Sequence, residues 1–192
     1  LIFLSSRFSF FLLLLFVIPC FFEMPIILKI WLQEFPEHTV SFLCIFLVTA
    51  LIESQVYSLN TAIQATGHIK WYNIITGIIL IFNLPVSYLF LKTGYHATTV
   101  LYTALAFTII SQISRIIISK RLLNMSLKVY FKNIVLKELI VTVISLIIPI
   151  IITFSMAESF TRLVIMSLLS FVYTIAVIYL LGLENNERRQ IK

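Results

Sequence analysis

Long apolar runs separated by short polar stretches dominate the pattern of hydrophobic and polar positions along this chain. A helix that crosses a bilayer needs about 20 apolar residues, because each residue advances the helix by about 1.5 Å. Six runs are long enough, and they lack the two-residue alternation of a membrane β-barrel. The pattern therefore predicts an all-α, multi-pass transmembrane helix bundle. The predicted spans are residues 8–30, 39–64, 72–91, 98–118, 134–154 and 161–181, followed by a polar tail at 184–192.

Prolines inside three of these runs predict bent or broken helices, since proline removes a backbone hydrogen bond of the helix. Pro19 and Pro25 lie in the first span, Pro85 in the third and Pro149 in the fifth. Glu23, between the first two prolines, is interpreted as an interfacial residue near the outer face of the membrane.

The second span carries a stripe of polar residues. At 100° per residue, its members fall within about 80° of one another on a helix that Gly67 ends, with His68 beyond it. The stripe consists of Thr49, Glu53, Tyr57, Asn60 and Gln64. One interpretation is a water-filled or substrate-facing cavity, because an intramembrane glutamate suggests a functional site. The alternative is hydrogen bonding that holds neighbouring helices together.

Two further sets of polar residues share helical faces. Thr76, Asn83 and Ser87 lie on one face of the third span. Thr108, Gln112 and Arg115 lie on one face of the fourth span. Asn83 and Arg115 join the stripe as candidate cavity-facing or substrate-facing residues. For Arg115, snorkelling of its guanidinium to the cytoplasmic surface is the competing interpretation.

Composition and charge identify lipid as the solvent and suggest an orientation. Of the 192 residues, 60% are hydrophobic and only 11% are charged, against about 25% charged in soluble domains. Lys and Arg lie between the apolar runs and not in an aromatic-rich patch, which argues against nucleic-acid binding. Eleven of the 14 fall on the side that holds both termini and the second-to-third and fourth-to-fifth connections. The positive-inside rule makes that side cytoplasmic.

The most basic connection spans residues 119–133. As a helix, it would place Arg121, Lys128 and Lys132 on one face and apolar residues on another, which is typical of an interfacial helix on anionic lipid. An ordinary basic loop that only sets topology is the equal alternative.

Sequence motifs for catalysis and cofactor binding are missing. Four scattered glycines cannot build a phosphate-binding loop, and neither a nucleophile elbow nor a Cys/His signature occurs. The three histidines are isolated, which argues against a metal site. Cys20 and Cys44 lie in apolar runs and are interpreted as small buried hydrophobic residues. We therefore expect no catalytic, cofactor-binding or metal-binding residues, and a protein that is not an enzyme.

Four stretches carry a family resemblance. They read PIILKIWL at 25–32, FPE at 35–37, TAIQATGHIKWY at 61–72 and NLPVSY at 83–88. The chain resembles the C-terminal part of bacterial polysaccharide biosynthesis proteins. These are the Wzx-type oligosaccharide flippases of the multidrug/oligosaccharidyl-lipid/polysaccharide superfamily, which are related to MATE transporters.

The resemblance implies a fragment of a two-lobe MATE-like transporter in the bacterial cytoplasmic membrane. The implied activity is export of undecaprenyl-linked oligosaccharide repeat units for O-antigen or capsule. The implied partners are that lipid-linked substrate, membrane lipid, a missing N-terminal lobe of the same protein and polysaccharide polymerase machinery, without nucleic acid. The alternatives are a drug or lipid II-type exporter of the same superfamily, or a non-catalytic membrane scaffold of polysaccharide assembly.

Overall fold

The computed structural model describes residues 2–67, 69–123 and 125–183, apart from the side chains of Ile2 and Val56. Its regular elements within this part of the chain are all helical. They make six helices that are long and apolar enough to cross a membrane, which confirms the predicted fold class. His68 and the predicted polar tail at 184–192 lie outside the described residues.

Several of the six membrane-crossing helices are built from shorter pieces. The first span is α1 (Ile2–Leu32), the second joins α2 (Thr39–Ser54) to α3 (Val56–Ala65), and the third joins α4 (Ile69–Ile81) to α5 (Asn83–Lys92). The fourth span is α6 (Thr99–Leu122). The fifth contains α7 (Leu127–Tyr130), the π-helix η1 (Phe131–Val135), α8 (Leu136–Ser145) and α9 (Ile147–Ser155). The sixth joins α10 (Phe160–Val177) to the π-helix η2 (Ile178–Gly182).

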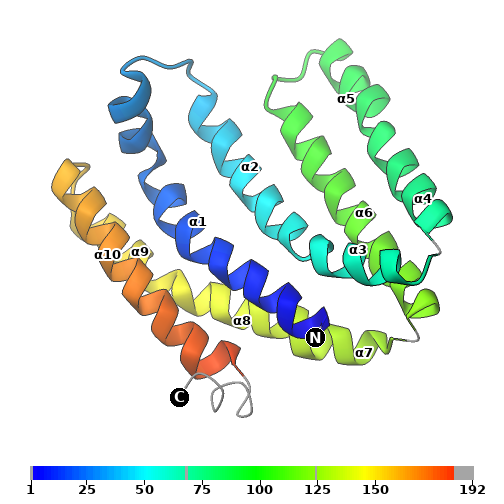
Figure 1. Ribbon diagram of the computed structural model, residues 1–192. Helices are drawn as coiled ribbons and strands as arrows, with labels where there is room; N and C mark the ends of the chain where they lie inside the picture. Colours follow the sequence, from blue (N-terminus) through cyan, green and yellow to red (C-terminus); the bar gives the residue numbers. More distant parts are fainter. Residues whose placement is uncertain (1, 68, 124, 184–192) are drawn as a thin grey trace.

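The helices form two groups, with the second span between them (Figure 1). In one group, α1 packs against α8, α9 and α10, while in the other α6 packs against α4 and α5. Because α2 contacts both α1 and α6, and α3 does the same, the second span joins the two groups. Any change in its shape therefore acts on both halves of the bundle.

Apolar packing is concentrated where α1 meets α8 and α10. Phe11, Leu14 and Ile18 of α1 are buried there against Val141 and Val177. A smaller cluster joins α3 to the fifth span through the buried side chains of Leu59, Tyr130 and Ile134. Large apolar side chains cover the outside of the bundle, where they suit contact with lipid tails.

Helix breaks occur near the prolines, as the sequence predicted. In α1, Glu23 leaves the helical conformation (φ −105°, ψ 15°) between Pro19 and Pro25. The third span is interrupted at Phe82, three residues before Pro85, and the fifth at Leu146, three residues before Pro149. The second span breaks at Gln55, in a segment without proline, and this break was not predicted.

Most of the predicted connection at residues 119–133 is helical, with Arg121, Lys128 and Lys132 exposed and Tyr130 buried, and its position relative to the lipid surface stays a prediction. The fourth span continues to Leu122, and α7 begins the fifth span at Leu127. The reason is burial. Tyr130 and Ile134 pack on Leu59, so helix formation here covers apolar surface within the protein.

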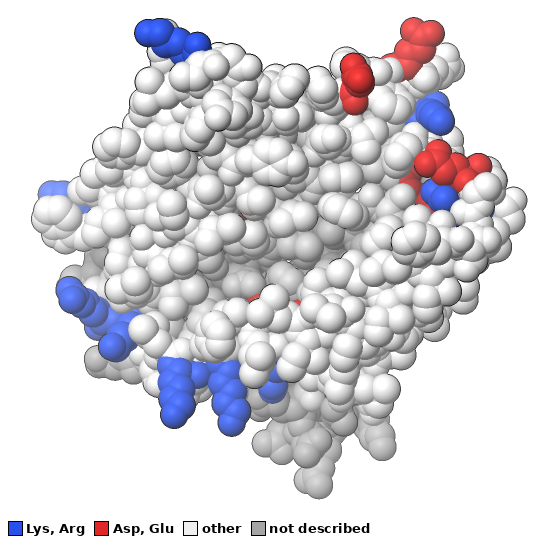
Figure 2. Space-filling view, turned by 180° about the vertical axis from the view of Figure 1, so that it is seen from behind, with Lys and Arg blue, Asp and Glu red and all other residues white. Residues whose placement is uncertain are grey.

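The two ends of the bundle differ in charge. Figure 2 shows Lys and Arg side chains gathered along its lower edge, while acidic side chains gather at the upper right. The exposed residues Lys120, Arg121 and Lys128 flank the α6–α7 turn, and the exposed Glu34 and Glu37 lie in the α1–α2 connection. This asymmetry agrees with the charge count along the sequence.

Candidate functional site: a polar cavity between α2, α4 and α6

The polar stripe of the second span is divided by the break at Gln55. Thr49 and Glu53 belong to α2, whereas Tyr57, Asn60 and Gln64 belong to α3. Figure 1 shows α3 running at an angle to α2. The five side chains consequently reach different surroundings and do not line a single cavity.

Each stripe residue has its own environment. The Thr49 hydroxyl donates a hydrogen bond to the Ile45 carbonyl of its own helix (2.9 Å). Asn60 accepts a hydrogen bond from the Tyr72 hydroxyl of α4 through its side-chain oxygen. Tyr57 is 70% exposed, and Gln64 is exposed. Glu53 is itself exposed, and it is the stripe residue that helps line a small polar cavity between helices.

That cavity lies between the second, third and fourth spans, and we call it the Glu53–Arg115 cavity. Its volume is about 10 Å³, which is room for about one water molecule. Glu53 comes from α2 and Leu80 from α4. The other lining residues lie on one face of α6, because they are three or four residues apart or adjacent. They are Thr108, Ser111, Gln112 and Arg115. The predicted shared face of Thr108, Gln112 and Arg115 therefore lines one cavity together with Glu53.

Several polar atoms in this cavity have no hydrogen-bond partner within the described protein. Gln112 is only 7% exposed, yet both its amide nitrogen and its amide oxygen are unpaired. The Ser111 hydroxyl and Arg115 Nε are buried and unpaired as well. A buried polar group without a partner costs about 1–3 kcal/mol. A ligand, or water, that supplies donors and acceptors would recover that free energy.

The charges of the cavity are opposite in sign but are not locked together. The Arg115 guanidinium carbon lies 5.9 Å from the centre of the Tyr72 ring, in a cation–π contact. In the described structure, no salt bridge of 4 Å or less joins Arg115 to Glu53. Arg115 is partly buried, and its guanidinium lies over the Tyr72 ring.

Asn83, the remaining candidate, lies in a separate polar contact. Its side-chain oxygen accepts a hydrogen bond from the Ser87 hydroxyl (3.0 Å), and Ser87 is bonded in turn to the Thr103 hydroxyl of α6 (2.6 Å). Thr76, on the same span, donates to the Tyr72 carbonyl (2.9 Å). This set is satisfied internally and joins α5 to α6.

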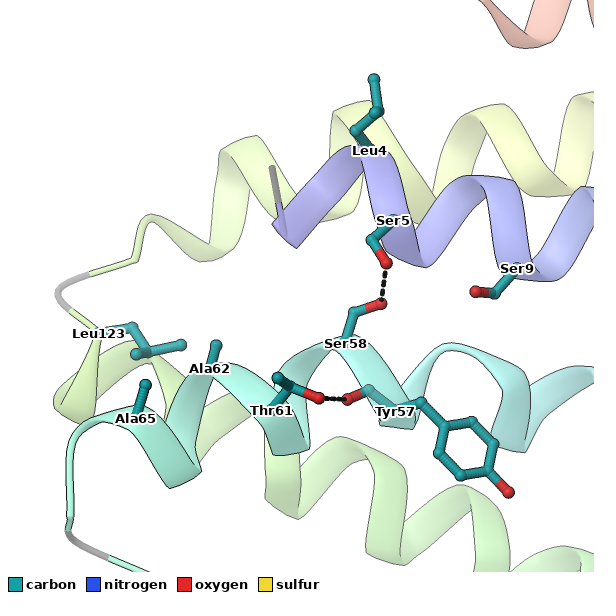
Figure 3. A pocket seen from close by; sticks show the side chains of 9 residues that line it. All are labelled: Leu4, Ser5, Ser9, Tyr57, Ser58, Thr61, Ala62, Ala65 and Leu123. Carbon is teal, nitrogen blue, oxygen red and sulfur yellow. Dashed lines mark hydrogen bonds between the residues drawn. The ribbon is translucent and has the colours of Figure 1, made fainter.

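A wider groove of about 590 Å³ runs between α1 and α3 (Figure 3). Serine and threonine hydroxyls are spread along an otherwise apolar wall, and Ser58 donates to Ser5 across it (3.0 Å). The Tyr57 ring extends away from that hydrogen bond. The lining residues are Leu4, Ser5, Ser9, Tyr57, Ser58, Thr61, Ala62, Ala65 and Leu123. The break at Gln55 thus separates this groove from the Glu53–Arg115 cavity.

The interpretation of Glu23 as an interfacial residue is wrong. Glu23 is fully buried and accepts two hydrogen bonds from Arg162 of α10, one from Nε (2.9 Å) and one from Nη2 (3.2 Å). Arg162 also donates from Nη1 to the Met156 carbonyl (3.1 Å). The sequence feature that pointed to Glu23 was a glutamate between two prolines in an apolar run. Its partner, 139 residues away, has no local signature.

Metal binding has no support in the described residues, where no group of three His, Cys, Asp or Glu side chains is placed to hold an ion. Cys20 and Cys44 are free and partly buried.

No protein-family model, curated protein or solved structure matches this chain.

Proposed function

We propose that this chain is part of an exporter that moves lipid-linked oligosaccharides across the bacterial cytoplasmic membrane. The observation that carries the proposal is the Glu53–Arg115 cavity. Its buried, unpaired Gln112 amide lines the same cavity as the Glu53 carboxyl group and the Arg115 guanidinium. Resemblance to the Wzx-type flippases supplies the class of substrate.

Sugar chemistry fits these groups if the cavity opens, because its volume of about 10 Å³ admits about one water and no sugar ring. A sugar that leaves water loses hydrogen bonds from many hydroxyls, each of which both donates and accepts. Gln112 offers an acceptor and donors in one side chain, Ser111 offers a hydroxyl, and Arg115 offers donors only. The isoprenoid tail of the substrate would stay in the lipid that surrounds the apolar outside of the bundle.

Broken helices support transport over a purely structural role. Interrupted membrane helices are typical of transporters, where they surround substrate sites and permit rearrangement. Here the second span breaks at Gln55, two residues beyond Glu53. A scaffold for polysaccharide assembly, one of the alternatives, would need neither this break nor unpaired polar atoms beside it.

Substitution of Glu53 in the full-length protein tests the proposal. In a strain that lacks the chromosomal gene, Glu53→Gln should reach normal protein levels while surface polysaccharide falls about tenfold or more. The reason is that a hydrogen bond to a charged group contributes about 1.5–3 kcal/mol, and 1.4 kcal/mol is a factor of ten. Glu34→Gln, in the exposed α1–α2 connection, is the matched control and should export normally.

The measurement is surface polysaccharide together with lipid-linked repeat units retained in the cell. Retained repeat units would distinguish failed export from failed synthesis. Normal export by Glu53→Gln would contradict the role of this cavity. If polysaccharide remains normal in the strain that lacks the gene, while export of a drug or of lipid II fails, an alternative transporter function replaces this one.

The orientation of the bundle is part of the proposal. We infer that the basic end, with the α3–α4 and α6–α7 turns, faces the cytoplasm, following the positive-inside rule. In a protein without Cys20 and Cys44, single cysteines at positions 36 and 158 should react with an impermeant reagent added to intact cells. Cysteines at positions 70 and 125 should react only after the cells are opened. Labelling of position 125 in intact cells would reverse the orientation.

A further inference from the structure

A second polar cluster lies where the break in the second span meets α1 and α8. Glu138 of α8 is 2% exposed, and its Oε2 accepts a hydrogen bond from the Gln55 side-chain amide. The Gln55 carbonyl accepts a hydrogen bond from the Ser6 hydroxyl of α1 (3.4 Å). The residue at which the helix breaks is therefore held from two sides, by a carboxylate and by a hydroxyl.

The Glu138 carboxylate is only half satisfied. Its Oε1 is buried and has no hydrogen-bond partner in the described structure. An ionised carboxylate only accepts hydrogen bonds, whereas a protonated one also donates one. A proton can therefore bind at Oε1 without displacing Gln55 from Oε2.

Two titratable groups act directly on this carboxylate, namely the Arg7 guanidinium of α1 and the Tyr130 phenol of α7. Arg7 is buried and donates from Nη1 to the Gly182 carbonyl of η2 (3.3 Å). Other charged or titratable side chains lie on α8 itself and on the elements packed against it. Lys137 of α8 is partly buried and has an interaction partner. Lys132 of η1 is exposed, Arg162 of α10 is bound to Glu23, and Tyr173 packs beside the apolar cluster. Tyr179 of η2 is 38% exposed.

We propose that Glu138 is a proton-binding site that controls the break at Gln55. The proton comes from water and forms an O–H bond at Oε1, which converts the carboxylate into a neutral carboxylic acid. Two consequences follow. The hydrogen bond from Gln55 loses its charge assistance, which about halves its strength. Arg7 loses the opposite charge beside it, so the buried cluster gains one positive charge. Proton binding thus loosens the hold on Gln55 and lets α3 move relative to α1.

Cross-linking between α1 and α3 measures this movement. In the full-length protein without Cys20 and Cys44, cysteines at positions 5 and 58 replace two serines whose hydroxyls are 3.0 Å apart. A cysteine pair at positions 87 and 103, where the hydroxyls are 2.6 Å apart, joins α5 to α6 and corrects for the pH dependence of thiol oxidation. The readout is the ratio of the two cross-linking rates.

The ratio should fall about three- to fivefold as the pH is lowered, because the Gln55 hydrogen bond changes from charge-assisted to neutral. Glu138→Gln, which cannot ionise, should give the low ratio at every pH. Glu138→Asp keeps a carboxylate and should keep the pH dependence. A wild-type ratio that does not change with pH, or an unchanged profile in Glu138→Gln, would overturn the proposal.

Infrared difference spectroscopy of the purified protein gives a second readout that does not depend on cysteines. A carboxylic C=O band should appear on acidification, be missing from Glu138→Gln and persist in the Glu34→Gln control. If Glu138→Gln does not fold, Glu138→Asp should still shift this band, and an unshifted band would contradict the assignment. Neither readout requires that the substrate be an oligosaccharide, so the proton site can fail or stand independently of the proposed function.

Discussion

Two regions of this bundle each combine a glutamate with an arginine, and they use the combination differently. At the Glu23–Arg162 pair, two hydrogen bonds of 2.9 and 3.2 Å join the side chains, and a third ties Arg162 to a carbonyl. In the Glu53–Arg115 cavity, the acid and the base line the same space without a salt bridge between them in the described structure. The neighbouring Gln112 amide is unpaired.

The difference lies in how many of the buried polar atoms have a hydrogen-bond partner. A buried ion pair whose hydrogen bonds are all formed joins two helices and has little capacity left for a ligand. Buried groups with unmet hydrogen bonds cost stability in the folded protein and gain it back only when something binds. The presence of an intramembrane charge is therefore less informative than the number of its partners.

The largest expected effect comes from breaking the Glu23–Arg162 pair. Glu23→Leu or Arg162→Leu alone leaves an uncompensated buried charge, which should cost about 3–5 kcal/mol of stability. The double variant Glu23→Leu/Arg162→Leu leaves no charge and should recover most of that loss. Thermal unfolding in detergent measures all three. Simple addition of the two single losses in the double variant would mean that the pair is not coupled.

Gln112→Leu should have the opposite effect on stability. It removes an amide that has no partner, so the free energy of unfolding should rise by about 1–3 kcal/mol, while export falls. Ile113→Leu, on the adjacent exposed position of α6, is the control and should change neither quantity by much. Loss of stability in Gln112→Leu would show that the amide has a structural partner, and would end the contrast between the two regions.

The contact between Ser87 and Thr103 is satisfied but neutral, and it should show a smaller effect. Ser87→Ala removes a buried hydrogen bond of 2.6 Å between α5 and α6 and should cost about 0.5–1.5 kcal/mol. Thr103→Val and the double variant complete a mutant cycle. Export should be unchanged at equal protein levels, and a strong export defect would place this contact within the transport site.

Thr49→Val should have the smallest effect, within about 0.5 kcal/mol, because its hydroxyl bonds only to a carbonyl of its own helix. Export and protein level should both match the wild type. A clear export defect in Thr49→Val would restore Thr49 to the substrate path and support the undivided stripe that the sequence suggested.

Local features of the sequence were enough to predict the spans and most of the helix breaks. Hydropathy located all six membrane-crossing helices, and prolines indicated the interruptions near Glu23, Phe82 and Leu146. The break at Gln55 has no such marker, and its hydrogen-bond partners Glu138 and Ser6 come from distant parts of the chain. Helical periodicity assumes a continuous helix, so it predicted that Thr49 to Gln64 lie in one stripe.

Prediction of the candidate site had the same physical limit. A common face for Thr108, Gln112 and Arg115 follows from helical geometry alone, and the structure places them in one cavity. Their meeting with Glu53 requires the packing of α2 against α6, which no spacing rule determines. The pairing of Glu23 with Arg162 and the burial of Glu138 are likewise products of tertiary structure.

The separation of Glu23 from Arg162 along the chain has a consequence for how the protein is made. Glu23 precedes its partner by 139 residues, and ribosomes add about 5–20 residues each second. The Glu23 carboxyl group of α1 therefore has no partner for about 7–28 s, until the guanidinium of α10 has been synthesised. An unpaired acid in a membrane helix costs at most about 2.5–3.5 kcal/mol on insertion scales, the value for the helix centre. During this interval, contact with the translocon or a membrane chaperone would shield the acid of α1 from lipid until the sixth span is inserted.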